Sequence, residues 1–337
     1  MKNGFLKRKN IEISFRRYLT DALGSMALGL FASLLIGTIF NSIGQKFEIA
    51  LFTDVIAPFA RTATGPAIAA AIAYGLQAPP LVLFSTAIVG LAANELGGPV
   101  GVYCATLIAV ELGKVVSKET SLDIIVTPAV TIITGVLAAQ FVGPYVWGIM
   151  TALGAIIVNA TKMQPLVMGA VVSVVVGITL TLPISSAAIC MMLRLDGLAA
   201  GAATVGCCAN MIGFAVISYR ENGFGGLMAQ GIGTSMLQMP NILRNPRIWI
   251  PSIAASAVLG PVSTMIFKME NIPIGAGMGT CGLVGQVGTI AAMGEGSEVY
   301  MAILLLHFIL PAMISLFVAR ILRKWGWIRP GDTKLDL

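Results

Sequence analysis

The sequence predicts an all-α polytopic membrane protein with about ten transmembrane helices and one or two re-entrant hairpins. The first observation behind this prediction is composition, since 57% of the 337 residues are hydrophobic and 11% are charged. A soluble domain carries roughly a quarter of its residues as charged side chains, so lipid must cover much of this surface. The second observation is that apolar segments of about 20 residues, the length that crosses a bilayer, recur along the chain. The third is that basic side chains gather at the two ends.

The basic side chains at the two ends predict the topology. Lysines and arginines cluster before the first apolar segment and again after the last one. Because Lys and Arg collect in cytoplasmic segments beside membrane spans, we expect both termini in the cytoplasm and an even number of crossings. The chain then divides into a basic tail over residues 1–18, a membrane domain over 19–322 and a second tail over 323–337. The net charge of +6 forms no basic patch outside these flanks, so nucleic acid is not an expected partner.

Apolar segments of two kinds follow one another along the chain. Five are mostly apolar and long enough to span a bilayer: Ala22–Ile43, Ile124–Val142, Pro165–Leu182, Trp249–Phe267 and Val299–Val318. The others are shorter or interrupted by Gly and Pro: Ile49–Tyr74, Leu81–Ala93, Val100–Val116, Val146–Val158, Ala187–Ala200, Ala202–Ile217 and Leu227–Leu237. Irregular backbone at membrane depth is tolerated only where protein or a wet cavity satisfies its polar groups. Interrupted helices therefore point to the binding site of a transporter.

A short motif, Asn-x-x-Gly-Gly, occurs twice, as NELGG at 94–98 and as NGFGG at 222–226. In both copies an apolar stretch, a basic loop and an apolar helix containing Pro and Gly follow. This order predicts a degenerate internal duplication with a period of about 125 residues. Chance similarity within a glycine-rich chain is the alternative.

The polar residues of this motif are the first candidates for a solute site. Asn94 and Glu95 in the first copy, and Glu221 and Asn222 in the second, lie beside glycines in apolar surroundings. Ionisable groups inside a membrane domain are costly and point to function. A carboxylate beside an amide can accept hydrogen bonds from sugar hydroxyls, and glycines let a ligand approach the backbone. Solvated loop ends are the alternative for both copies.

A third segment, GAGMGTCGLVGQ over residues 275–286, is rich in glycine. This composition disfavours a long helix and predicts a tight hairpin whose backbone groups face a cavity. Thr280 and Gln286 would supply side-chain contacts to a solute there. Close helix packing through glycine is the alternative.

Asn210 and His307 are the remaining candidates. A buried amide needs partners, so Asn210 either bonds a neighbouring helix or contacts the solute. His307, the single histidine, is either a proton carrier or hydroxyl ligand, or a neutral structural side chain. The histidine and the five cysteines show no metal-ligand spacing, so neither a metal nor a cofactor is expected. No nucleophile–base set indicates an enzyme acting by itself, and the weakly charged interior favours a small polar solute that is neutral or weakly charged.

Four stretches resemble the second EIIC-like family of bacterial phosphotransferase-system permeases, which includes membrane proteins named after the perfringolysin O regulator: NELGGPVG (94–101), ENGFGGLMAQGIGTSM (221–236), NPRIWIP (245–251) and PIGAGMGTCGLVGQ (273–286). The resemblance covers nearly the whole chain. It implies a sugar-permease fold, a homodimer in the bacterial plasma membrane, and a sugar or polyol as solute. Glu95 is carried over by position alone, because the GITE-like glutamate motif of sugar permeases is missing. These residues include no IIA or IIB module, so any sugar phosphorylation needs separate IIA and IIB proteins.

Two functions remain open at this point. The first is a phosphotransferase-type permease that binds a sugar-like solute in a cavity near the membrane midplane and moves it across the bilayer. The alternative is a membrane sensor or regulator, in which a permease fold controls gene expression through a cytoplasmic partner.

Overall fold

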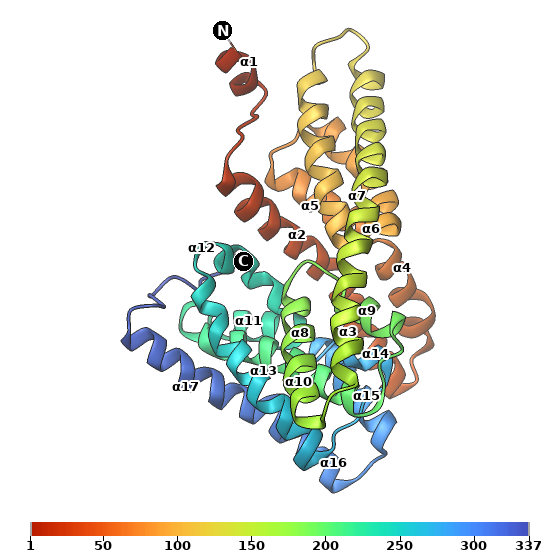
Figure 1. Cartoon of the computed structure of the whole chain (residues 1–337). Coiled ribbons are helices and arrows are strands. Elements are labelled where there is room, and N and C mark those ends of the chain that lie inside the picture. Colours follow the sequence, from red (N-terminus) through yellow and green to blue (C-terminus); the bar gives the residue numbers. More distant parts are fainter. Residues whose placement is uncertain (1, 336–337) are drawn as a thin grey trace. The chain divides into compact units, whose positions relative to one another are not determined.

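The computed structural model describes residues 2–335 (Figure 1). Within these residues every regular element is a helix, and the β-type pairing is limited to one isolated bridge between Gly197 and Asn271. The all-α fold class is therefore confirmed. The chain divides into two compact units, one formed by Met1–Gly37 and Asp54–Ile149, the other by Thr38–Thr53 and Met150–Leu337.

The first unit consists of the N-terminal helices, with η denoting a 3-10 or π helix. Its elements are α1 (Lys2–Arg8), η1 (Arg17–Asp21), α2 (Ala22–Leu30), η2 (Phe31–Leu35), α4 (Ala57–Thr62), α5 (Thr64–Gly75), α6 (Pro80–Val116) and most of α7 (Asp123–Thr161). Glycines let α5 and α6 touch backbone to backbone, since a Cβ on Gly65 would overlap the carbonyl group of Gly90, and the converse also holds. Small residues of this kind drive helix pairing in membranes, where lipid provides no hydrophobic force between helices.

The second unit contains the remaining elements and the C-terminal end of α7. The boundaries between the two units fall inside α3, η3 and α7, so each of these helices has residues in both units. In chain order the remaining elements are α3 (Ile36–Phe47), η3 (Leu51–Ile56), α8 (Pro165–Thr181), α9 (Ser186–Met192), α10 (Gly197–Ile217), α11 (Tyr219–Met228), η4 (Ala229–Gly233), η5 (Ser235–Gln238), α12 (Met239–Arg244), η6 (Pro246–Trp249), α13 (Ile250–Val262), η7 (Ser263–Phe267), α14 (Pro273–Ala276), η8 (Cys281–Leu283), α15 (Val284–Met293), α16 (Ser297–Ile303), η9 (Leu304–Ile309) and α17 (Leu310–Lys324).

Helix α10 is the centre of this second unit. In its most apolar stretch 89% of the residues are buried, because α8, α13 and α17 pack around it. Its small residues make this possible: a Cβ on Gly206 would overlap the backbone of Ser173 on α8. A Cβ on Gly213 would lie 2.6 Å from the hydroxyls of both Ser252 on α13 and Ser315 on α17. Helix α10 is thus held by residues that leave no room for a larger side chain.

Two helices are broken at glycines that lie within the two copies of the repeated motif. Helix α6 is interrupted at Gly97 (φ −150°, ψ 16°) and Gly98 (φ 55°, ψ −157°), and α11 at Gly223 (φ 60°, ψ −159°). Gly98 and Gly223 therefore share one backbone conformation, which is essentially restricted to glycine, and lie 125 residues apart. This spacing equals the predicted period of about 125 residues, while the duplication itself stays a prediction. The motif alone pairs Gly98 with Gly226, whereas the shared conformation pairs Gly98 with Gly223.

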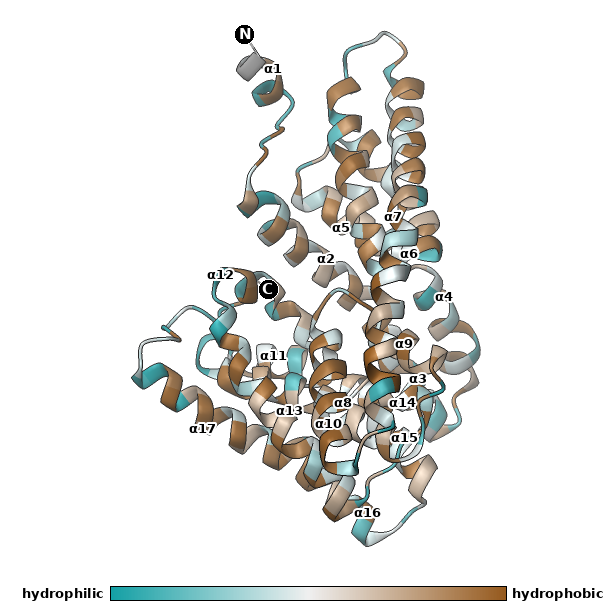
Figure 2. Cartoon of the chain, viewed as in Figure 1, coloured by the Kyte–Doolittle hydropathy of each residue, from teal (hydrophilic) through white to brown (hydrophobic). Residues whose placement is uncertain are grey.

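The helices are long and apolar enough to cross a membrane several times. Six described stretches qualify, or seven if the bent pair Leu51–Thr62 and Thr64–Gly75 counts as one span. Large apolar side chains stand on the surface, among them Phe141 of α7 (74% exposed) and Phe317 of α17 (66% exposed), and Figure 2 shows apolar residues along both helices. The chain is therefore a multi-pass membrane protein, while the expected number of about ten helices stays a prediction.

Candidate functional site

The glycine-rich segment is folded into short pieces rather than one helix. Asn271, which is 1% exposed, organises it. Its Nδ2 donates to Thr204 Oγ1 on α10 (2.7 Å), to the carbonyl oxygen of Gly285 (2.9 Å) and to Thr289 Oγ1 (3.1 Å). Its Oδ1 accepts from the backbone N–H of Ile272 (2.7 Å). One amide thereby joins the start of α14 and the body of α15 to α10, and the sequence analysis did not single it out.

The turn between α14 and α15 lies directly on α10. Gly279 has φ +55°, and a Cβ there would lie 2.6 Å from the Cβ of Cys207, so only glycine fits. Thr280 follows, fully buried, and its hydroxyl donates to the carbonyl oxygen of Gly231 on η4 at 2.5 Å. Thr280 therefore fixes the turn to η4 through its own side chain.

Two of the predicted site residues, Gln286 and His307, meet in the interior. Gln286 Nε2 lies 3.0 Å from His307 Nδ1 and 3.6 Å from the Sγ of Cys208. His307 is fully buried and lies in η9, a π-helical stretch, a geometry that occurs frequently at functional sites. The pair joins segments that are 21 residues apart in the chain.

Each member of this pair keeps one polar atom without a hydrogen-bond partner among the described residues. These atoms are Gln286 Oε1 and His307 Nε2. A buried polar atom left unpaired costs about 1–3 kcal/mol, and such an atom in a native protein needs an explanation. Each atom can pair with a hydroxyl, because the Gln oxygen accepts a hydrogen bond and a His ring nitrogen either donates or accepts one.

Asn210 lies on α10 in a complete network. Its Oδ1 accepts from Trp249 Nε1 (2.8 Å) and from Thr181 Oγ1 (3.3 Å). Its Nδ2 donates to the carbonyl oxygen of Gly206 (3.1 Å) and to Ser256 Oγ (3.3 Å). These bonds connect α10 with α8, η6 and α13, so the amide is already engaged in holding helices together.

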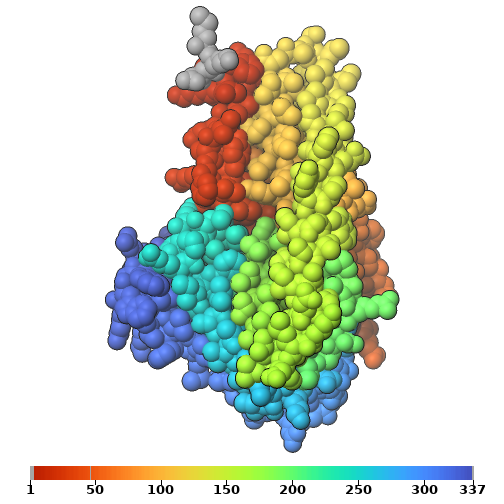
Figure 3. Space-filling model, viewed as in Figure 1, coloured from red at the N-terminus to blue at the C-terminus, as the bar shows by residue number. Residues whose placement is uncertain are grey.

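Glu221 and Asn222 bind the C-terminal segment, which is the described stretch 325–335 that follows α17. The Glu221 carboxylate accepts from the backbone N–H of Gly331 (2.9 Å) and from the N–H and hydroxyl of Thr333 (3.0 and 2.9 Å). Asn222 donates to the carbonyl oxygen of Thr333 (2.9 Å) and accepts from the N–H of Leu335 (2.8 Å). Figure 3 shows the blue C-terminal residues of this unit beside the turquoise surface of the preceding helices.

A row of buried amides extends this contact, and the sequence analysis missed it. Gln230 donates to Ser218 Oγ (2.8 Å), and Gln238 donates to Gln230 Oε1 (2.9 Å) and to the carbonyl oxygen of Thr333 (2.9 Å). Asn241 donates to Gln238 Oε1 (2.9 Å) and to the carbonyl oxygen of Lys334 (2.8 Å). The signal was present in the stretch MAQGIGTSMLQMPN, where three amides stand in an apolar run.

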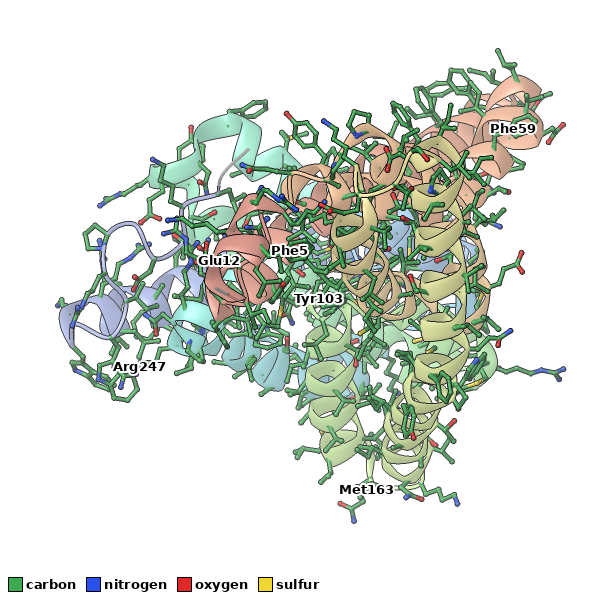
Figure 4. The ribbon with its side chains drawn as sticks, turned by 90° about the horizontal axis from the view of Figure 1, so that it is seen from above. Phe5, Glu12, Phe59, Tyr103, Met163 and Arg247 are labelled. Atoms are coloured by element: carbon green, nitrogen blue, oxygen red, sulfur yellow. The ribbon has the colours of Figure 1, made fainter. Side chains whose placement is uncertain are left out.

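The part of the C-terminal segment nearest to α17 is held by polar and cation–π contacts. Asn245 donates to the carbonyl oxygen of Trp327 (2.9 Å) and to Asp332 Oδ2 (2.7 Å). The Arg247 guanidinium lies 5.1 Å from the centre of the Trp327 ring, and Figure 4 shows Arg247 at the edge of the second unit.

Asn94 and Glu95 belong to the first compact unit. They lie on α6 just before its break, where Asn94 is half-buried and Glu95 is exposed. Asn94 faces α5, since a Cβ on Gly65 would lie 2.7 Å from the Asn94 Cβ. Glycine at 65 is thus what allows this amide to lie against the neighbouring helix.

Comparison with known proteins gives one result. The family model described as "Phosphotransferase system, EIIC" matches residues 20–335. Neither the curated proteins nor the solved structures contain a match to the chain.

Proposed function

The chain belongs to the EIIC family of the phosphotransferase system, and from this premise we propose that it binds and translocates a small, neutral, hydroxyl-rich solute such as a sugar or polyol. The family makes it a permease-type membrane transporter. The proposal adds the class of solute and the residues that contact it.

The observation that carries the proposal is the Gln286–His307 pair. Two buried side chains 3.0 Å apart each keep an unpaired polar atom. Gln286 lies in α15 beside the glycine-rich turn, and His307 lies in the π-helical η9. A sugar hydroxyl offers one donor and two acceptor sites, which matches the two free atoms. We therefore assign Gln286 and His307 as the first contacts with the solute.

The other candidate residues are assigned secondary roles in solute binding. Asn94 and Glu95 border the break in α6 of the first unit and stay candidates for solute contact on that unit alone. Thr280, Asn210, Glu221 and Asn222 already have partners within the chain, so a role in solute binding would require them to exchange those bonds.

The coupling partners are also part of the proposal. The chain has one histidine, which is buried, and the described cysteines are buried or partly buried. A phosphoryl group would therefore be supplied by separate IIA and IIB proteins. We further propose a homodimer in the bacterial plasma membrane, with both termini in the cytoplasm.

Uptake into proteoliposomes tests the solute class. A panel of labelled hexoses and polyols is offered to the purified wild-type chain, first alone and then with IIA and IIB proteins and phosphoenolpyruvate. We expect saturable uptake of at least one member, and its phosphate ester inside the vesicle when the partners are present. A panel with neither uptake nor ligand-induced thermal stabilisation contradicts the proposed solute class.

Two variants test the assigned contacts. Gln286→Met removes the free oxygen at similar length. His307→Asn keeps a nitrogen near the Nδ1 position and removes Nε2. We expect each to lower uptake at least tenfold, while melting in detergent stays near that of the wild type. Thr179→Val is the control, because the buried Thr179 hydroxyl donates only to Val175 on its own helix; normal uptake in the two site variants would argue against this assignment.

A further inference from the structure

A cavity of about 950 Å³ opens beside α17 in the second unit. The side chains that line it change from apolar to basic along that helix. Met313, Leu316 and Phe317 line one part, and Arg320, Arg323 and Lys324 line the other. Met313, Phe317, Arg320 and Lys324 follow one another at spacings of four, three and four residues, so they share one face of α17.

A second helix completes the basic end of the cavity. Arg220 lies in the first turn of α11, and Leu227 lies further along the same helix. Arg220 and Leu227 lie on opposite sides of the break at Gly223, and both line the cavity. The cavity is therefore lined by cations and apolar side chains from two elements, α11 and α17.

The four cations have no carboxylate partner. The ion pairs among the described residues involve Arg8, Lys9 and Lys114, all in the first unit. Arg323 donates to the carbonyl oxygen of Ile217 at 2.6 Å. The neighbouring Glu221 carboxylate is occupied by Gly331 and Thr333. The basic end thus has four positive groups and an excess of hydrogen-bond donors.

The apolar end is open rather than packed. Met313 is 60% exposed, Leu316 44% and Phe317 66%. These side chains suit an acyl chain, whereas the cations suit a phosphate. Basic pockets between helices at the cytoplasmic side of a membrane protein recognise anionic lipid head groups.

We infer that this cavity binds one anionic glycerophospholipid, with the phosphate between Arg220, Arg320 and Lys324 and an acyl chain along Phe317. The site is independent of the proposed solute pathway, since it shares no residue with the Gln286–His307 pair.

Native mass spectrometry of the full, delipidated chain in detergent tests this inference. The probes are phosphatidylglycerol and phosphatidylcholine with identical acyl chains. We expect phosphatidylglycerol to bind at least tenfold more tightly. The double variant Arg320→Gln/Lys324→Gln should weaken its binding about 30-fold, from the contribution of each basic residue near an anionic surface.

The matched control removes the same charge elsewhere in the second unit. Arg194→Gln/Lys268→Gln replaces two exposed cations outside the cavity and should leave lipid binding unchanged. Among the described residues neither Arg320 nor Lys324 forms a side-chain hydrogen bond or ion pair, so the double variant should melt like the wild type in lipid-free detergent. The charge-preserving Arg320→Lys/Lys324→Arg variant should keep most of the binding.

Three kinds of result would overturn the inference. The first is equal affinity for the two lipids or equal weakening in the control. The second is full competition by inorganic phosphate at millimolar concentration, which would assign the site to a free anion. The third is a change of oligomeric mass in the double variant in place of a change in bound lipid, which would assign the face to a contact between copies of the chain.

Discussion

At the scale of single residues, the second unit contains two kinds of buried amide. Gln230, Gln238, Asn210 and Asn271 have their bonds completed by other parts of the chain. Gln286 keeps its oxygen unpaired. Because removing a bonded group leaves its former partners desolvated and unpaired, the two kinds should respond differently to the same substitution.

Replacing one amide of each kind measures this difference. Gln238→Leu removes the partner of Gln230 Oε1 and one partner of the Thr333 carbonyl oxygen, and we expect it to destabilise the protein by about 2–4 kcal/mol. Gln286→Leu removes the contact with His307 and relieves one unpaired atom, so a loss of about 1 kcal/mol is expected. Unfolding in mixed micelles with increasing denaturing detergent gives both values. An equal loss in both variants would contradict the distinction.

At the scale of elements, the breaks in α6 and α11 were predictable from the sequence. The hydrogen bonds between the second unit's buried amides and the C-terminal segment were not. Glycines next to Pro99 and Asn222 mark the interruptions in the sequence itself, because the required backbone conformation is a local property. The amides of Gln238 and Asn241 bond Thr333 and Lys334, which lie 95 and 93 residues away. No local pattern specifies such a pairing, so the sequence analysis found the interruptions and gave Glu221 and Asn222 a solute role while missing the C-terminal segment that they hold.

The glycines at the breaks give a test with an internal control. Gly98→Ala and Gly223→Ala meet no atom within 4 Å, so their cost is the backbone strain alone, of order 1–3 kcal/mol. We expect the two losses to agree closely because the backbone angles do. Gly225→Ala also meets no atom within 4 Å but has no positive φ, and should gain up to about 1 kcal/mol. Thermal melting of the three variants checks this; a stable Gly98→Ala beside an unstable Gly223→Ala would break the proposed equivalence.

At the scale of the whole molecule, the C-terminal segment ties the end of the chain to α11, more than 100 residues earlier. The bonds from Gly331 and Thr333 to Glu221 span 110 and 112 positions. Contacts of one segment are released together when that segment opens locally as a cooperative unit. Removing the Glu221 carboxylate, which accepts three of these bonds, should therefore loosen the segment.

Hydrogen exchange measures that dependence. In Glu221→Ala the amides of Gly331 and Thr333 lose their acceptors, and we expect the peptide covering 328–335 to exchange at least tenfold faster. Glu298→Ala removes a carboxylate from the first turn of α16 and should leave this peptide unchanged. Equal protection in Glu221→Ala would mean that the amides of Gln238 and Asn241 suffice to hold the segment.

The way the C-terminal segment is bound also governs which changes it tolerates. Most of its bonds use the main chain: the N–H groups of Gly331, Thr333 and Leu335 and the carbonyl oxygens of Thr333 and Lys334. Gly331 and Lys334 are exposed, while Thr333 and Leu335 are buried. Spacing from the end of α17 thus matters more than composition, so inserting or deleting one residue between Lys324 and Thr333 disrupts the fit more than exchanging Lys334 for another polar residue.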